Sequence, residues 1–432
     1  MMLDKYFKIT ENKSTLRTEI IAGITTFMTM VYILAVNPSI LSAAGMDKDA
    51  VFTATALSAV IATLVMALVA KLPFALAPGM GLNAFFAFTV VLGMGYSWKF
   101  ALTAVFLEGI IFLILTAFNV RELIVNSIPL NLKHAVSVGI GLFIAFIGLK
   151  GTGLIVDNPA TLVSLGSMKN PAVWVGLAGV IIIGVLLVKQ IKGAILIGIL
   201  VSTLIGLMVG VTIIPEGFTF VSLPPSIEPI FFKFDFSQVF TIDMAIVLFT
   251  FLFVDMFDTV GTLVGVSSKS GMLDEEGRVP RVKQALFADS IGTFVGAMLG
   301  TSTVTTYVES AAGVAEGGKT GMTALTVAVM FALSLFFAPL FMIIPAAATA
   351  PALIIVGLMM ITPITKVNLD DYTEAIPAFF TIIMMPLTYS IAEGIVFGML
   401  AYVLLKLLTG KAKEIKPIMY LITVLFVIKF FF

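Results

Sequence analysis

The sequence predicts an all-α polytopic membrane protein that crosses the bilayer fourteen times, as two halves of seven spans with opposite orientation. Of its 432 residues, 59% are hydrophobic and only 12% are charged, whereas a soluble domain carries about 25% charged residues. The mean hydropathy is +1.13. In corresponding positions of the two halves, a polar, glycine-rich segment interrupts an apolar run. Paired interruptions of this kind are typical of secondary transporters.

Apolar runs bounded by charge, glycine or proline define the spans, at about 20 residues for each helix that crosses a bilayer. The longest break, Ile213–Ser237, separates seven runs from seven. Because each half has an odd number of spans, the second half must enter the membrane inverted. The spans are expected near 20–41, 51–70, 74–91, 99–118, 130–149, 172–189 and 191–212, then near 240–264, 284–299, 305–316, 320–344, 349–364, 373–388 and 391–408.

The distribution of positive charge predicts the orientation. With the N-terminus in the cytoplasm, most of the 25 Lys and Arg residues lie on the cytoplasmic side. Five of these residues are expected on the outer side: Lys48, Lys99, Lys150, Lys169 and Lys233. Lys429 is assigned to neither side. This bias places both termini in the cytoplasm of a plasma-membrane protein. Residues 1–19 are expected to be a cytoplasmic segment, and 409–432 a tail whose residues 417–432 form an interfacial helix.

The third span, LPFALAPGMGLNAFFAF from Leu72 to Phe88, is predicted to be broken. Pro78 disfavours a helical conformation for the preceding residue and cannot donate a hydrogen bond. Two nearby glycines loosen the turn. We therefore expect an extended segment before Pro78 and a helix that resumes through Asn83.

The tenth span, within Gly300–Gly321, is predicted to be broken in the same way. Its β-branched run Thr301–Thr306 disfavours helix, and a helix is expected to restart near Glu309. The two extended segments can pair with each other, which satisfies backbone groups that lipid cannot bond. The half-helices that follow would direct their positive N-terminal ends at a shared pocket at mid-bilayer.

Carboxyl groups at membrane depth are costly to bury and are functional candidates by default. Glu309 lies in the broken tenth span, and Asp255 and Asp258 lie three residues apart in the eighth span, on one helix face. Asp258 ranks first of the two because it opens the small, polar run DTVGT. For Glu108 and Asp289, a structural role in supporting a broken span is as good an explanation as a role with substrate.

Other chemistry is excluded or disfavoured. Without cysteine the chain has no disulfide and no thiolate metal site. Residues Gly313–Thr320, GVAEGGKT, match the nucleotide-binding P-loop pattern, but they lie between membrane spans and not between a strand and a helix of a soluble sheet. We interpret these glycines as the end of a short helix. His134, at a span end, is expected at the interface, and neither metal, cofactor nor nucleic-acid partner is expected.

Three strings resemble the adenine/guanine/hypoxanthine permease branch of the nucleobase–ascorbate transporter superfamily: APGMGLNAFF, DTVGTLVG and GTSTVTTYVESAAG. The resemblance extends from about Phe7 to the end of the chain. It implies a core domain, 20–118 and 240–344, that moves against a gate domain, 130–212 and 349–408. It also implies a purine permease and not an enzyme. The expected substrate-binding residues are Glu309, Asp258, Asn83, Thr306, Tyr307 and Thr262, and the candidates for proton coupling are Asp258, Glu309, Asp255 and Asp289.

A purine base suits such a site, because a carboxylate can accept two adjacent N–H groups. Burial disfavours the charged form of a carboxyl group, so Asp258 or Glu309 could carry the coupling proton. The alternative is an anion carrier, sulfate-like, or a channel of the same fold, but an anion sits poorly beside two carboxylates without a nearby cation. The sequence leaves three questions open: which purine is preferred, whether Na⁺ replaces H⁺ as the coupling ion, and whether the protein is a monomer or a homodimer.

Overall fold

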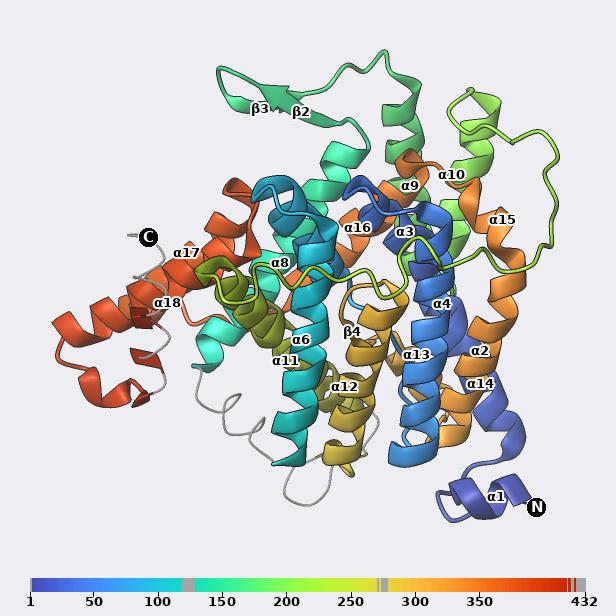
Figure 1. Cartoon of the computed structure of the whole chain (residues 1–432), viewed down its shortest axis with the longest axis horizontal. Coiled ribbons are helices and arrows are strands. Elements are labelled where there is room, and N and C mark those ends of the chain that lie inside the picture. The colour runs from blue at the N-terminus through green and yellow to red at the C-terminus, as the bar shows by residue number, and fades with distance from the viewer. Residues whose placement is uncertain are drawn as a thin grey trace.

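The computed structural model describes residues 2–118, 129–269, 272, 279–417, 419, 420, 423 and 424. Helices dominate this part of the chain, and α4, α6, α12 and α14 lie side by side (Figure 1). The first half contains α1 (Met2–Phe7), α2 (Leu16–Met30), α3 (Ile33–Ala43), α4 (Lys48–Val65), η1 (Met66–Ala70), β1 (Leu76–Pro78), α5 (Met80–Ala84), η2 (Phe85–Gly93), α6 (Trp98–Ala117), α8 (Leu130–Gly151), β2 (Ile155–Asn158), β3 (Leu162–Leu165), α9 (Pro171–Val188) and α10 (Ala194–Met208). The second half contains α11 (Ile242–Lys269), α12 (Val282–Leu299), β4 (Val304–Thr306), α13 (Ser310–Ala315), α14 (Gly321–Ser334), η3 (Leu335–Phe337), α15 (Ala338–Met342), α16 (Ala346–Ile361), η4 (Thr362–Lys366), α17 (Tyr372–Leu387), α18 (Ile391–Leu408) and η5 (Ala412–Glu414).

Nine helical segments of the described residues are long and apolar enough to cross a membrane. Three shorter apolar helices, Met80–Gly93, Ala194–Met208 and Tyr372–Leu387, add to them. Together with α12 and α13, these segments occupy the ranges that the sequence predicts for spans. The chain is therefore a multi-pass membrane protein, while the count of fourteen spans stays a prediction. Most of the predicted interfacial helix, 417–432, lies outside the described residues.

The helices pack in two groups. In one group, α2, α4, α6, α12 and α14 pack together around the strands β1 and β4, with α11 against α6 and β4. In the other, α8 packs against α16 and α17, α17 against α18, and α9 against α10 and α16. The assignment of these groups to a core and a gate domain stays a prediction, as does their movement against each other.

The third and tenth spans are both interrupted, as predicted, and their extended segments pair. β1 runs antiparallel to β4, with Leu76 opposite Thr306 and Pro78 opposite Val304. The pairing continues on both sides, since Gly79 N–H donates to Thr303 O at 2.9 Å and Tyr307 N–H donates to Ala75 O at 2.9 Å. Every residue of the two strands is buried. The pairing thus satisfies peptide groups at a depth where lipid offers no partner.

The outer edge of each strand is bonded by a threonine from the preceding long helix. Thr63 Oγ1 on α4 accepts from Leu76 N–H at 3.0 Å and donates to Leu76 O at 3.1 Å. Thr293 Oγ1 on α12 accepts from Val304 N–H at 3.3 Å and donates to Val304 O at 3.0 Å. The same arrangement recurs in both halves, as an inverted repeat requires. It closes the two edges of a sheet that would otherwise expose unpaired groups.

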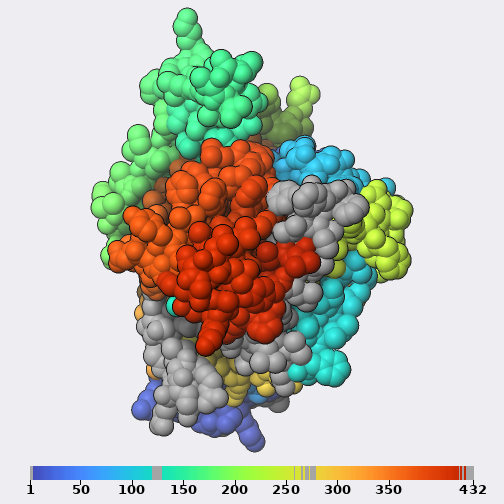
Figure 2. Space-filling model, turned by 90° about the vertical axis from the view of Figure 1, so that its left-hand side faces the viewer, coloured from blue at the N-terminus to red at the C-terminus, as the bar shows by residue number. Residues whose placement is uncertain are grey.

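Two features differ from the expectations. The first span is not one continuous helix, because it breaks between α2 and α3 at Val31–Tyr32. Thr29 Oγ1 donates to Thr26 O at 2.8 Å, and such back-bonding by threonine bends helices without any glycine or proline signal. The second feature is the hairpin β2–β3, which the sequence did not predict and which projects from one end of the molecule (Figure 2).

Candidate functional site

Glu309 lies where the tenth span turns from strand to helix. It lies three residues after the end of β4 and is the N-cap residue of α13, so the helix restarts where the sequence predicts. Its side chain is half-buried, and its Oε1 accepts a hydrogen bond of 2.6 Å from the hydroxyl of Tyr32. Thr29 Oγ1 donates to the backbone oxygen of Glu309 at 3.4 Å. The first span therefore positions this carboxylate directly.

Asp258 approaches the same strand pair from α11. Its Oδ2 accepts a hydrogen bond of 3.1 Å from Thr305 Oγ1 on β4, and its side chain is half-buried. Next to Thr305, the hydroxyl of Thr306 is buried and has no hydrogen-bond partner among the described residues. Asp258 and Glu309 lie within electrostatic range of each other and of Tyr32. One carboxylate thus bonds β4 and a second lies just beyond its end, and the strand also carries a buried hydroxyl that has no partner among the described residues.

The side chains of Asn83 and Tyr307 hydrogen-bond to the backbone of the broken third span. Tyr307 donates from its hydroxyl to Pro78 O at 2.6 Å, and Asn83 donates from Nδ2 to the same oxygen at 3.4 Å. Asn83 Oδ1 also accepts from the Ser302 hydroxyl. Both residues therefore link one interrupted span to the other. Thr262, one helical turn after Asp258, is buried at the edge of this region.

Three further buried carboxyl groups, those of Asp255, Asp289 and Glu108, lie on α11, α12 and α6. Thr259 Oγ1 lies 2.6 Å from Asp289 Oδ1 and 3.2 Å from Asp255 Oδ1, so it joins α11 to α12. Glu108 on α6 accepts from Thr303 Oγ1 at 2.5 Å, just before β4. For Glu108 this contact matches the supporting role that the sequence left open. Asp255 bonds Thr259 of its own helix and not β4, although it shares a helix face with Asp258 in the sequence pattern.

The string Gly313–Thr320, which matches the P-loop pattern, joins α13 to α14, and a carboxylate side chain of the same protein bonds its backbone amides. α13 ends before Gly317, whose φ of +97° is one that glycine adopts readily. The carboxylate of Glu19, fully buried on α2, accepts from Lys319 N–H at 3.1 Å and Thr320 N–H at 3.2 Å. It also accepts from the Thr323 hydroxyl at 2.6 Å. Backbone amides that a P-loop offers to phosphate are here occupied by a side chain of the same protein.

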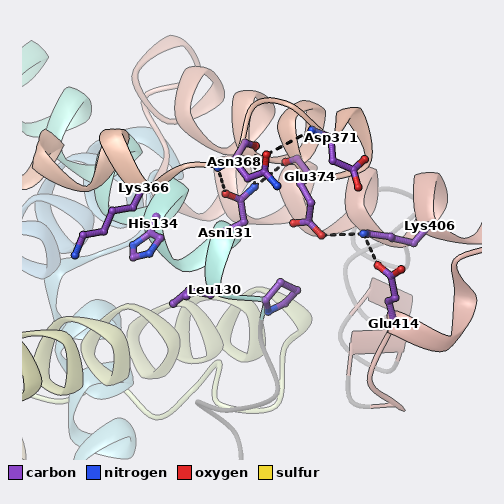
Figure 3. Close-up of a pocket in the computed structure, with 10 residues that line it drawn as sticks. Leu130, Asn131, His134, Lys366, Asn368, Asp371, Glu374, Lys406 and Glu414 are labelled. Carbon is purple, nitrogen blue, oxygen red and sulfur yellow. Dashed lines mark hydrogen bonds and ion pairs between the residues drawn. The ribbon is translucent and has the colours of Figure 1, made fainter. Parts of the chain in front are cut away.

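A cavity of about 450 Å³ lies elsewhere, where α8, α17 and α18 meet (Figure 3). Lys406, only 2% exposed, pairs there with Glu374 at 2.8 Å and with Glu414 at 2.6 Å. His134 lines this cavity, and its position at the membrane interface stays a prediction. None of the predicted substrate-binding residues lines it, and its polar groups are largely paired with each other. Among the residues that the structure describes, no cluster of His, Asp and Glu could hold a metal ion.

Sequence reasoning missed Tyr32 and Thr29 as parts of the site. Their signal is present, because Thr25, Thr29 and Tyr32 recur at helical spacing within an otherwise apolar run. Polar side chains on one face of a membrane helix mark a surface that faces protein or a cavity. Only the contact with Glu309, 277 positions away, gives that face a role.

The two interrupted spans, their paired strands and the buried carboxyl groups define a membrane transporter of the inverted-repeat class. Solved structures share the fold. The transmembrane domain of a cyanobacterial bicarbonate transporter, BicA, aligns with a TM-score of 0.63 at 17% identity, over 90% of this chain and 97% of that one. A murine solute carrier 26 anion transporter in the inward-facing state aligns with a TM-score of 0.62 at 13% identity, over 94% and 72%.

Sequence comparison identifies the family. The Xan_ur_permease model, described as a permease family, matches residues 17–397. Adenine permease AdeP of Escherichia coli is 46% identical over 431 residues, covering 100% of this chain and 96% of the relative. Guanine/hypoxanthine permease PbuG of Bacillus subtilis is 46% identical over 438 residues, covering 99% of both. The chain belongs to this permease family, in its adenine and guanine/hypoxanthine branch, and is a transporter and not an enzyme.

Proposed function

We propose that this protein transports purine nucleobases across the plasma membrane by secondary active uptake. The observation that carries the proposal is that Asp258 bonds the strand β4 at Thr305 while Glu309 lies three residues after its end, with the buried hydroxyl of Thr306 between them in the chain. The relatives AdeP and PbuG, named as adenine and guanine/hypoxanthine permeases, support the same class of substrate.

The chemistry of the base supports these roles. A purine is flat and uncharged, with N–H donors and ring-nitrogen acceptors along its edges. A carboxylate accepts such N–H groups in short, charge-assisted bonds, and a threonine hydroxyl can donate to a ring nitrogen. Glu309 and Asp258 would supply the acceptors and Thr306 the donor. Asn83 and Tyr307 would act indirectly, because their polar atoms already bond the broken backbone.

We further propose that a proton drives uptake. A carboxyl group that is partly removed from water can bind a proton on one side of the membrane and release it on the other. Asp258 is the first candidate because its bond to Thr305 couples its charge to the substrate strand. Asp255 and Asp289 are secondary candidates through Thr259. The group of helices around β1 and β4 would move against the group around α8 and α16 to expose the site alternately.

An anion substrate is disfavoured by the side chains of this site. The aligned transporters of anions share the fold, but fold alone does not specify a substrate. Among the described residues, no Lys or Arg bonds to Asp258 or Glu309, so an anion would meet two acidic groups without a compensating charge.

The orientation and assembly are also proposals. The excess of Lys and Arg in the loops on one side supports cytoplasmic termini. A homodimer remains an expectation that cross-linking in native membranes would test, since a monomeric species alone would refute it.

The test is uptake of labelled adenine, guanine and hypoxanthine by vesicles that contain the purified protein. We expect uptake without ATP that increases with an inward proton gradient. Glu309→Gln should weaken binding about 10-fold to 100-fold, because one charge-assisted hydrogen bond is worth about 1.5–3 kcal/mol. Asp258→Asn should abolish the response to pH. Glu228→Gln, which alters an exposed carboxylate in the long connection, serves as the control. Normal uptake by both site variants would refute the assignment.

A further inference from the structure

The break in the first span brings a tyrosine to the site. Tyr32 is 1% exposed, and its hydroxyl donates to Glu309 Oε1 at 2.6 Å. The short distance and the ionisable acceptor identify a strong bond. Thr29, one turn earlier, adds a bond to the backbone of Glu309. The side chain and the backbone of Glu309 are therefore both positioned by the first span.

This contact limits what Glu309 can offer to a ligand. A carboxylate has two oxygens, and it can accept one N–H on each when a ligand presents two side by side. Each carboxylate oxygen has two lone pairs, as Glu19 Oε2 shows by accepting from both Thr320 N–H and the Thr323 hydroxyl. With Tyr32 bonded to Oε1, a ligand that presents two adjacent N–H groups must therefore share that oxygen with the phenol or displace it. A ligand that presents one N–H can use Oε2 and leave the phenol in place.

We propose that Tyr32 determines specificity among purines, by favouring bases that present a single N–H to Glu309 over bases that present two adjacent N–H groups. The inference rests on the proposed transport of purines. On its pyrimidine edge, hypoxanthine carries one N–H, at N1, whereas guanine carries the N1–H and the neighbouring 2-amino group. The two bases otherwise share their ring system and their 6-oxo group, so Tyr32 acts on the one difference between them.

The cost of sharing Oε1 with the phenol, or of displacing the phenol from it, gives the preference its physical basis. A buried hydroxyl that loses its partner pays the desolvation penalty of an unsatisfied group. Tyr32 is nearly inaccessible to water, so water cannot replace Glu309 readily. Tyr307 does not compete for this role, because its hydroxyl bonds to the carbonyl of Pro78 and not to a carboxylate.

The chain offers a matched control. Tyr96 donates from its hydroxyl to the carboxylate of Asp243, which makes a second tyrosine–carboxylate pair away from the strands. Phenylalanine at either position removes one hydroxyl and keeps the ring. A general effect of losing such a bond would thus be seen in both variants, and an effect on purine specificity only in one.

The experiment measures the dissociation constants of hypoxanthine and guanine for the full-length protein in vesicles. We expect Tyr32→Phe to shift the ratio of the two constants about tenfold in favour of guanine, the size of one bond to a charged group. Tyr96→Phe should leave the ratio unchanged. With Glu309→Gln in the background, Tyr32→Phe should no longer change the ratio. An equal change for both bases, or an unchanged ratio, would overturn the inference.

A second measurement keeps the proposal testable if Tyr32→Phe is not produced in folded form. With 3-fluorotyrosine incorporated at position 32, the ¹⁹F signal should shift when guanine binds and stay nearly in place when hypoxanthine binds. Identical shifts with both bases would contradict the proposal. Failure of the proposed function is distinguishable, since the unmodified protein would then bind neither base.

Discussion

Replacing Thr63 or Thr293 by valine tests whether the strand pair depends on threonines from the neighbouring helices. Valine has nearly the same shape but removes both hydrogen bonds to the backbone N–H and C=O of one buried residue, Leu76 or Val304. At about 0.5–1.5 kcal/mol for each bond, every variant should lose about 1–3 kcal/mol of stability. Since both threonines support the same two-stranded sheet, the double variant should lose less than the sum of the two.

The assay is the thermal unfolding midpoint in detergent, together with purine affinity. A loss of this size lowers the Tm of a large domain by about 2–4 °C for each kcal/mol. Serine at either position keeps the hydroxyl and should restore most of the loss. Thr203→Val is the matched control, because that hydroxyl donates only within its own helix, to Ile199 O at 2.8 Å. If the valine variants unfold at the same temperature as this control, the threonines do not support the strands.

Three further outcomes follow from the packing and charges. Gly79→Ala should reduce purine uptake strongly, because its new Cβ would lie 2.2 Å from Thr305 Cγ2 and force the strands apart. Glu19→Gln should lower the Tm by several degrees, because an amide oxygen cannot replace a carboxylate that accepts three bonds. The Lys411 ammonium beside Asp371 holds the pKa of that carboxyl well below its usual range, so the pair should stabilise the fold above about pH 4 and lose its effect as acid protonates Asp371.

Each outcome has a control. Gly261→Ala adds the same methyl group in open space within α11 and should leave uptake unchanged. Thr320→Ala removes a different bond at the start of α14, and if it lowers the Tm as much as Glu19→Gln, the carboxylate has no special role. Lys411→Met should lower the Tm at about pH 7 and by clearly less at about pH 2, because the contribution is lost only as the pH falls through the lowered pKa of Asp371. Equal effects at both pH values would contradict the charge interaction, which is small because both groups are partly exposed.

Much of the fold could be read from local chemistry. Pro78 and the β-branched run before Glu309 disfavour helix by their own covalent structure, so they predict the two interruptions wherever the chain folds. Apolar runs mark the spans because lipid tolerates few charges in any context. The restart of the helix at Ser310, directly after Glu309, follows for the same local reasons.

The break in the first span and the hairpin β2–β3 could not be read in this way. The break at Val31–Tyr32 contains no glycine or proline. It depends on the hydroxyl of Thr29, which donates to the backbone oxygen of Thr26. The hairpin is a short, exposed pair whose strands contain no long alternating pattern. Where local preferences are this weak, the conformation of a segment depends on the residues that pack against it and not on its own sequence.

By itself the sequence determined which residues carry acid groups at membrane depth and where the third and tenth spans stop being helical. Only the tertiary structure decided which of these groups meet. The packing of α11 brings Asp258 to Thr305 on β4, whereas Asp255 bonds Thr259 of its own helix, which in turn bonds Asp289 on α12. Tyr32 bonds to Glu309, from which it is separated by 277 positions in the sequence. Such contacts depend on how whole helices pack, and side-chain chemistry at a single position contains no information about a partner hundreds of residues away.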